Sequence, residues 1–272
     1  MLRIDLNTIR YMNSMEVKFK VVIPSYNNES WVEYNLASIL NQTYTNYEVL
    51  YINDASIDNT LSKVNNIVGN LNNWKIVSNK VNRRRGYNVS PYNSNILNFI
   101  NNDDDVLVFV DGDDWLFDEN VFYKLSNFYS KKNIWMTYGG LICYPSETPG
   151  YPQNTKYDNE VCDKNLFRLD HWRASHLRTF KWGLYKKIKL ESMIYSKTND
   201  YYFHAEDLAT SFPCLEMCPE NKIGVLDFYS YVFNETPSNR QRGIIRENEA
   251  GNELELEIRN QIPYSKIKSI YE

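Results

Sequence analysis

The strongest constraint on the fold is a run of five apolar residues, 106–110, which ends in a cluster of carboxylates. Four of the five are β-branched or aromatic, a composition typical of a strand buried on both faces. Asp111, Asp113 and Asp114 follow within four positions, and an open α/β sheet binds ligands at the carboxyl ends of its strands. Because crowded carboxylates repel one another, the cluster predicts a site for a hard cation, Mg²⁺ or Mn²⁺. A solvated acidic turn is the alternative.

The rest of the chain alternates between strand-like and helix-like patterns. Apolar or alternating segments predict strands at 18–25, 47–53, 74–78, 134–143 and 228–233. Helical periodicity and capping residues predict helices at about 31–41, 60–68, 91–100, 120–129 and 206–217, with a charged helix from residue 246. Because the connections are too short for anything but crossovers, we expect an α/β fold with a mostly parallel sheet flanked by helices on both faces.

Composition excludes several functional classes. A net charge of −4 over 272 residues argues against nucleic acid or an anionic membrane as a partner. The four cysteines show no zinc-ligand spacing. Residues 1–20 do not form a signal peptide, and no later segment approaches the length of a membrane span, so we expect a cytoplasmic protein. The loop at 144–165 is long and rich in Pro, Gly and Asn, which favours a functional role.

Five segments in order resemble glycosyltransferase family 2, the inverting nucleotide-sugar enzymes with the GT-A fold, over about residues 18–235. They are VVIPSYNNE (21–29), SILNQTYTNYEVL (38–50), NDASIDNT (53–60), VDGDDWL (110–116) and AEDL (205–208). The run HLRTFK (176–181) is similar to a subgroup of viral and bacterial relatives. The Asn-, Ile- and Tyr-rich composition would suit a viral genome, in which case the protein would work in the host cytoplasm.

This resemblance implies a domain organisation and a reaction. A GT-A domain at 18–235 would have a nucleotide-binding half (18–116) and a smaller acceptor half (117–235). An N-terminal lead-in (1–17) would precede it, and a C-terminal loop and helix (236–272) would follow it. The implied donor is a nucleotide-diphosphate sugar, with UDP-sugar expected, and the implied cofactor is Mn²⁺ or Mg²⁺. The sugar would pass to a hydroxyl of a glycan, protein or lipid-linked acceptor.

The same resemblance assigns roles to individual residues. Asp207 matches the catalytic base, Glu206 matches its supporting neighbour, and Asp113 matches the metal ligand. The residues matched to the nucleotide-sugar pocket are Pro24, Tyr26, Glu29, Asp54, Asp111, Gly112 and Asp113. Trp115, His176 and Arg178 are candidate contacts for the donor or the acceptor. For the acidic pair a structural role is the alternative, since acids favour a helix N-terminus.

One departure from the family pattern concerns the diphosphate side of the pocket. The family usually has an Arg-Asn pair where this chain has Tyr92-Asn93, so the usual arginine is absent. Arg83 or Arg85 would have to replace it, and we assign Arg85 to the nucleotide-sugar pocket on that basis. A solvated basic loop at 83–85 is the alternative.

Three other functional classes are weighed against this assignment. A haloacid-dehalogenase phosphatase also carries a D-x-D motif after a strand, but after its first strand, whereas here it follows the fourth. A nucleotidyltransferase would need a Gly-rich basic loop after the first strand, and residues 24–28 contain no glycine. A sugar-nucleotide- or glycan-binding pseudoenzyme would differ from an enzyme only in lacking turnover.

Overall fold

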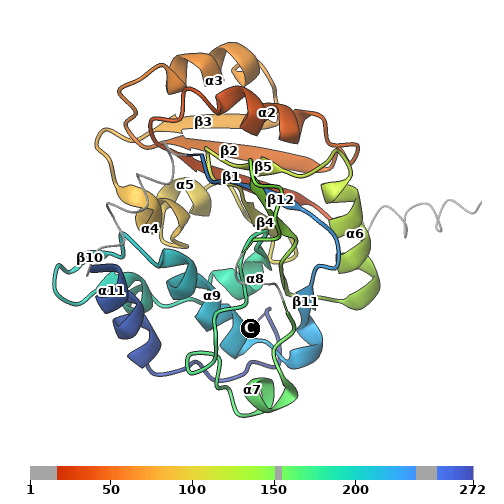
Figure 1. Cartoon of the computed structure of the whole chain (residues 1–272), viewed down its shortest axis with the longest axis vertical. Helices are drawn as coiled ribbons and strands as arrows, with labels where there is room; N and C mark the ends of the chain where they lie inside the picture. Colours follow the sequence, from red (N-terminus) through yellow and green to blue (C-terminus); the bar gives the residue numbers. More distant parts are fainter. Residues whose placement is uncertain (1–16, 151–154, 237–249, 272) are drawn as a thin grey trace, which may run out of the picture.

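The structure is a computed structural model that describes residues 17–150, 155–236 and 250–271. The main element of this described part is a seven-stranded sheet with the strand order β11-β6-β8-β4-β1-β2-β3 (Figure 1). Its strands are β1 (Phe19–Ser25), β2 (Tyr47–Asn53), β3 (Trp74–Ser78), β4 (Val106–Phe109), β6 (Met136–Tyr138), β8 (Thr179–Lys181) and β11 (Ile223–Val225). Residues 1–16 of the predicted lead-in and the start of the predicted C-terminal helix, 246–249, lie outside the described residues.

Parallel pairing dominates this sheet. β1 pairs in parallel with β2 and β4, β2 pairs with β3, and β6 pairs with β11. The prediction of an α/β fold with a mostly parallel sheet is therefore confirmed. β8 is antiparallel to both of its neighbours, β4 and β6. The sequence did not predict this strand, because three residues are too few to show a period and all their partners are distant in sequence.

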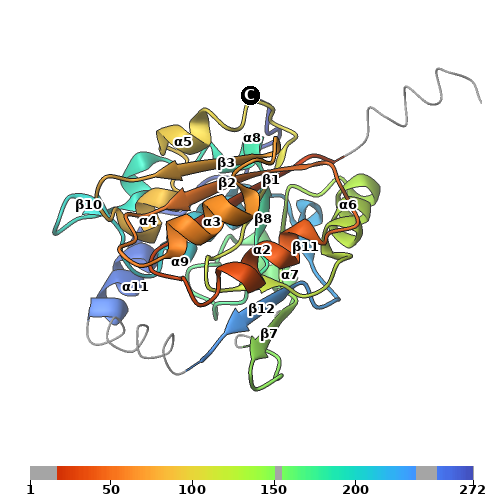
Figure 2. The ribbon, with the colours of Figure 1, turned by 90° about the horizontal axis from the view of Figure 1, so that it is seen from above.

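Side chains that alternate along the central strands supply two separate cores. The helices that pack around them are α2 (Val32–Leu40), α3 (Thr60–Val68), α4 (Arg84–Val89), α5 (Ser94–Leu97), α6 (Val121–Lys132), α7 (Asn159–Asp163), α8 (Trp182–Tyr185), α9 (Glu206–Met217) and α11 (Ala250–Asn260). Val21 and Val108 lie in one core with α2, α3 and α6, whereas Val22 and Leu107 lie in the other with α4, α5, α8 and α9. Figures 1 and 2 show α2 and α3 over one face of β1, β2 and β3, with α9 and α11 on the opposite side in Figure 1.

Two small sheets complete the arrangement. β5 (Trp115–Leu116), β12 (Tyr231–Asn234) and β7 (Leu141–Tyr144) form a three-stranded sheet, in which β12 is antiparallel to β5 and parallel to β7. β7 and β12 lie to one side of the main sheet (Figure 2). β9 (Ile194–Tyr195) and β10 (Asp200–Tyr201) form a hairpin. The 3₁₀ turns η1 (Leu190–Met193) and η2 (Glu220–Lys222) precede β9 and β11.

Several predicted elements differ from the structure in extent, among them the strand predicted at 228–233, which is β12 at 231–234, and the helix predicted at 120–129, which is α6 at 121–132. The helix predicted at 91–100 is reduced to α5, at 94–97, whose N-cap Asn93 accepts from the N–H of Asn95. The helix α4, at 84–89, was not predicted, and it ends at Ser90, which is extended (ψ 138°) as expected for the residue before a proline. The strand predicted at 134–143 is interrupted between β6 and β7, where Gly139 and Gly140 have φ values of 111° and 82°. The two glycines therefore separate β6, in the main sheet, from β7, in the small sheet.

The C-terminal segment packs on the domain. Leu254 and Ile258 of α11, together with Ile270, are buried in the core that contains α9. Arg168 donates through Nε and Nη2 to the buried carboxylate of Glu216 in α9, at 2.5 and 3.0 Å. No helix in the described part of the chain combines the length and the apolar character needed to cross a membrane.

Candidate active site

The acidic loop after β4 is shaped by the end of β1 and by α2. The backbone N–H of Gly112 donates to the carbonyl of Pro24 at 3.1 Å. A Cβ at position 112 would lie 2.3 Å from Oγ of Ser25, so the close approach of these two segments requires glycine. Nδ2 of Asn35 in α2 donates to the carbonyls of Asp111 and Asp114, at 2.9 and 2.7 Å. The carboxyl ends of β1 and β4 therefore form one rigid edge.

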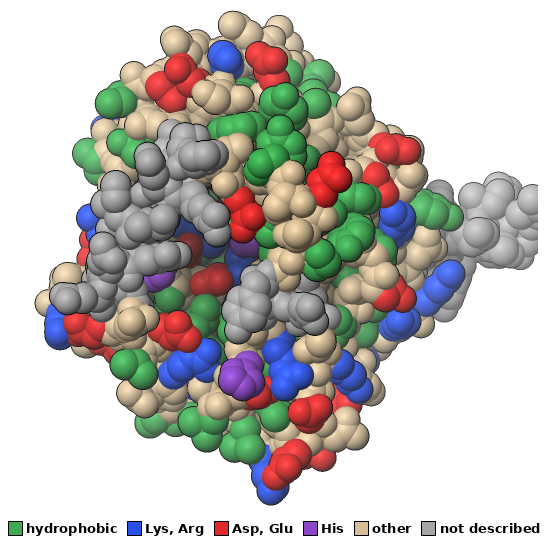
Figure 3. All heavy atoms as spheres, in the orientation of Figure 1, with side chains coloured by type: hydrophobic (Ala, Val, Ile, Leu, Met, Phe, Trp, Pro, Cys, Tyr) green, Lys and Arg blue, Asp and Glu red, His purple; other side chains and the backbone are tan. Residues whose placement is uncertain are grey.

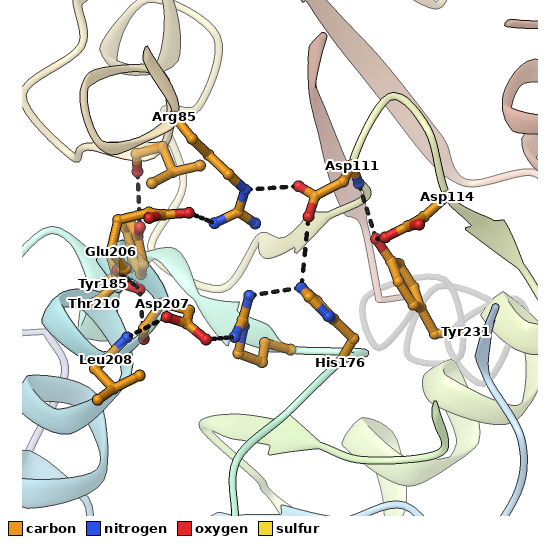
Figure 4. A network of polar contacts seen from close by, with 12 residues as sticks. Arg85, Asp111, Asp114, His176, Tyr185, Glu206, Asp207, Leu208, Thr210 and Tyr231 are labelled. Carbon is orange, nitrogen blue, oxygen red and sulfur yellow. Dashed lines mark hydrogen bonds and ion pairs between the residues drawn. The ribbon is translucent and has the colours of Figure 1, made fainter. Parts of the chain in front are cut away.

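Arg85 connects this loop to α9. Its Nε donates to Oδ1 of Asp111 at 2.7 Å, and its Nη1 donates to Oε1 of Glu206 at 2.9 Å (Figure 4). Burial by itself lowers the pKa of Arg85, but the carboxylates of Asp111 and Glu206 outweigh it and hold the pKa well above its ordinary value. The side chain is 22% exposed, so the alternative of a solvated loop is wrong for Arg85. Arg85 brings together two carboxylates that are 95 positions apart in sequence.

Arg83 and Arg84 lie in a different environment. Their backbone N–H groups both donate to the buried carboxylate of Asp54, each at 2.8 Å. The guanidinium of Arg83 lies 4.1 Å from the ring centre of Tyr87, and that of Arg84 lies 5.0 Å from the ring centre of Phe203. Asp54 thus fixes the start of α4 and the orientation from which Arg85 reaches the site.

A second chain of contacts runs from Asp111 to Asp207. Nη1 of Arg178 donates to Oδ2 of Asp207 at 3.0 Å, and Nη2 lies 2.7 Å from Nε2 of His176. Burial lowers the pKa of His176 well below its ordinary value, and the charges of Arg178 and Arg85 lower it further. His176 is therefore neutral, and since an arginine can only donate, Nε2 accepts and the ring proton is on Nδ1. Nε2 is also 3.7 Å from Oδ2 of Asp111.

Asp114 faces the protein interior rather than the site. Oδ2 accepts from the hydroxyl of Tyr231 and Oδ1 accepts from the backbone N–H of Asn234, both at 2.8 Å. Burial raises the pKa of Asp114 well above its ordinary value, and the neighbouring carboxylates of Asp113 and Asp111 raise it further. The Tyr231 hydroxyl also accepts from the backbone N–H of Asp111 at 3.0 Å, and its ring stacks on His176 at 4.6 Å.

These contacts correct one expectation drawn from the sequence. The crowding of three carboxylates does not by itself require a cation. The carboxylate of Asp111 accepts a hydrogen bond from Arg85, and that of Asp114 accepts from Tyr231 and Asn234. Tyr231 and Asn234 were missed as site residues. They lie about 120 positions after the acidic cluster, and the signal there was a short apolar strand without a motif.

The residues predicted from the first-strand loop lie at the same edge of the sheet. The N–H of Asp54 donates to the carbonyl of Ser25 at 2.8 Å, which joins the ends of β1 and β2. Glu29 accepts from the N–H of Asn59 at 2.8 Å, and Tyr26 is 37% exposed. Trp115 begins β5, which continues directly from the acidic loop.

The carboxylates of the acidic loop fit a divalent cation whose coordination is completed by a bound substrate. Within residues 17–150, 155–236 and 250–271, no group of three His, Cys, Asp or Glu side chains is placed to hold a metal ion alone. Asp111 and Asp113 nevertheless supply hard oxygen donors at the end of β4. Mg²⁺ and similar cations bind through one or two carboxylates together with substrate phosphates, so two carboxylates are sufficient for a site of that kind.

The site has carboxylates on two sides, from the acidic loop and from α9. This arrangement is suited to a displacement reaction at a substrate atom that is bound between them. Asp111 faces the first turn of α9, where Glu206 and Asp207 lie, and Arg85 spans the two (Figure 4). Asp207 is 28% exposed, so its carboxylate is accessible from outside. Figure 3 shows acidic, basic and histidine side chains meeting in a hollow of this face.

Comparisons with known proteins agree with this geometry. The sequence profile of glycosyl transferase family 2 matches residues 20–192. An uncharacterized glycosyltransferase of Haemophilus influenzae is 26% identical over an alignment of 245 residues, which covers 84% of this chain and 72% of the relative.

Solved structures show the same fold at low identity. TarS of S. aureus in complex with UDP-GlcNAc has a TM-score of 0.57 and 18% identity, and the match covers 81% of this chain but only 59% of the TarS chain. Glucosyl-3-phosphoglycerate synthase from Mycobacterium tuberculosis, in complex with Mn²⁺, UDP and glucosyl-3-phosphoglycerate, has a TM-score of 0.56 and 14% identity, covering 97% of this chain and 87% of that one. The architecture is that of the GT-A glycosyltransferases, as the resemblance implied.

Proposed function

Because the chain belongs to glycosyl transferase family 2, we propose that it transfers a sugar from a UDP-sugar to an acceptor hydroxyl, with inversion at the anomeric carbon. The acceptor would be a glycan, a protein or a lipid-linked molecule. The observation that carries the proposal is the pair of facing carboxylate groups, with Arg85 between them. The UDP ligands of TarS and of the mycobacterial synthase support a uridine donor.

In this proposal Asp207 is the general base. Its carboxylate accepts from Arg178 and from the N–H of Leu208, at 3.0 Å each, and these two contacts set its orientation. It takes the proton of the acceptor hydroxyl as that oxygen attacks the anomeric carbon from the side opposite the diphosphate. A single displacement with one base gives inversion.

Arg85 and the acidic loop act on the donor side. The guanidinium of Arg85 lies beside Asp111, where it can stabilise the negative charge that develops on the departing diphosphate. Asp113, with Asp111, would hold Mn²⁺ or Mg²⁺, which supplies a Lewis acid for the same charge. The Mn²⁺ bound in the mycobacterial synthase supports this cofactor.

The substitution Asp207→Asn tests the role of the base. It keeps the size of the side chain and removes its basicity, so turnover should fall by about 10²–10⁴. Donor affinity should stay within a few-fold, because the base interacts with the acceptor. UDP with Mn²⁺ at about a hundredfold over the dissociation constant should stabilise wild type and variant alike by roughly 2.7 kcal/mol, measured by thermal unfolding.

Asp200→Asn is the matched control. Asp200 also accepts from the N–H of the following residue, at 2.8 Å, but it lies in the exposed β9–β10 hairpin. It should leave turnover unchanged. Normal turnover in Asp207→Asn would place the base elsewhere, and binding without turnover in the wild type would favour a sugar-nucleotide-binding pseudoenzyme.

A further inference from the structure

Four aromatic side chains form a continuous surface beside the acidic loop. We call this surface the aromatic platform and define it as Trp31, Tyr34, Trp115 and Tyr144. The ring centres of Trp31 and Trp115 are 6.1 Å apart with the planes inclined by only 22°. Tyr34 lies 5.4 Å and Tyr144 lies 5.3 Å from Trp115. Tyr34 is 55% exposed and Tyr144 39% exposed, so the rings are not simply part of the core.

The platform is fixed relative to the candidate catalytic residues. Trp115 follows the acidic loop directly, and it is paired with Val232 in the small sheet. Asn35, the neighbour of Tyr34, donates to two carbonyls of the acidic loop, and Oγ of Ser38 accepts from the N–H of Leu116 at 3.1 Å. Because α2 and β5 are held in this way, the backbone that carries Tyr34 and Trp115 is fixed before any ligand binds, which lowers the entropy cost of binding.

The charge around the platform argues against a lipid surface as its occupant. Glu29 and Glu33 flank Trp31 along the chain, and Lys63, 3.8 Å from Glu33, balances one of them. Anionic membranes attract clusters of Lys and Arg, and this rim carries a net negative charge instead. Figure 3 shows hydrophobic side chains gathered over α2 and β5, next to the hollow with charged side chains.

A sugar ring fits the position and the chemistry of this surface. Aromatic faces are electron-rich, and they attract the polarised C–H groups on the apolar face of a pyranose. The platform is continuous with the loop that carries Asp113, so a ring stacked there would lie next to the donor site. We propose that the aromatic platform binds a sugar ring of the acceptor, so that the acceptor is a glycoside. This inference rests on the proposed function, and it narrows the acceptor from any hydroxyl compound to a glycan or a glycolipid headgroup.

The test compares two tyrosines of nearly equal exposure. Tyr34 on α2 is 55% exposed and Tyr123 on α6 is 56% exposed, but only Tyr34 belongs to the platform. Methyl glycosides of glucose, galactose and N-acetylglucosamine serve as ring-containing acceptors, and glycerol serves as an open-chain one. Tyr34→Ala should raise the KM for the best methyl glycoside by about three- to tenfold. Tyr34→Phe should restore the wild-type KM, since the ring is retained, and Tyr123→Ala should match the wild type.

The possible outcomes separate this inference from the proposed function. Donor hydrolysis and stabilisation by UDP with Mn²⁺ report on the donor site, and their absence in the wild type would contradict the proposed function itself. If both are normal and Tyr34→Ala has the same glycoside KM as Tyr123→Ala, the platform inference is overturned. It is equally overturned if glycerol is as good an acceptor as the glycosides. Binding of wild type, but not Tyr34→Ala, to vesicles of phosphatidylcholine and phosphatidylglycerol, with unchanged glycoside KM, would assign the surface to lipid and refute the proposal.

Discussion

Replacing Arg85 by methionine tests whether this side chain holds the two halves of the site together. The substitution removes hydrogen bonds of 2.7 Å to Asp111 and 2.9 Å to Glu206 while keeping most of the apolar stem. A hydrogen bond to a charged group contributes about 1.5–3 kcal/mol, and removing one partner of a buried ion pair costs about 3–5 kcal/mol. The two carboxylates are 18% and 13% exposed, so water relieves part of this cost.

We therefore expect Arg85→Met to lower the free energy of unfolding by about 3 kcal/mol. In a chain of this size that corresponds to roughly 6–12 °C in Tm. The assay is thermal unfolding with and without Mn²⁺. Without the guanidinium, no positive charge among the described residues neutralises Asp111, so Mn²⁺ alone should raise the Tm of the variant more than that of the wild type.

Arg84→Met is the matched control for this experiment. The guanidinium of Arg84 stacks on Phe203 at 5.0 Å, next along the chain from Arg85 but away from Asp111. Its loss should change Tm by a small fraction of the Arg85 effect, and it should not alter the response to Mn²⁺. Equal Tm values for the two variants, or an equal response to Mn²⁺, would refute the bridging role of Arg85.

Two further predictions concern His176, which lies near Asp111, and Gly112 of the acidic loop. Burial lowers the pKa of His176 in the folded protein, so near pH 6.5 the unfolded chain takes up a proton on this residue and the folded protein does not. The neutral His176 therefore costs no stability above pH 6.5. As the pH falls below 6.5, the free energy of unfolding decreases by up to about 1.4 kcal/mol per pH unit. His176→Phe keeps the stacking on Tyr231 and should give a flatter profile of Tm against pH, whereas parallel profiles would contradict the assignment of a neutral imidazole. Gly112→Ala places a Cβ 2.3 Å from Oγ of Ser25, so it should lower the free energy of unfolding by about 1–3 kcal/mol, measured by thermal unfolding. It should also weaken the binding of UDP, measured by calorimetry. Wild-type values in both experiments would show that the end of β1 adapts to the added methyl group.

The sequence alone determined the parts of this protein that depend on local periodicity. β2, β3, α3 and α9 begin and end where their patterns predicted, and β1 and β4 differ from prediction by a single residue at one end. The acidic loop could be found because a buried strand that runs directly into several carboxylates is a pattern typical of a ligand site. Asp207 and Glu206 came from the family resemblance, since an acidic helix start has a structural interpretation as well.

The tertiary structure decided how these elements meet. The sequence pattern gives the face of a strand but not its neighbour, so nothing local could place β8 between β4 and β6 in antiparallel orientation. The same holds for the side chains of the site. Arg85 and Asp114 are charged groups in polar stretches, and whether each is solvated, paired or buried depends on partners such as Glu206 and Tyr231, which lie more than a hundred positions away. Local sequence sets which groups are available, and only the packing of distant segments sets the desolvation and the charge around them.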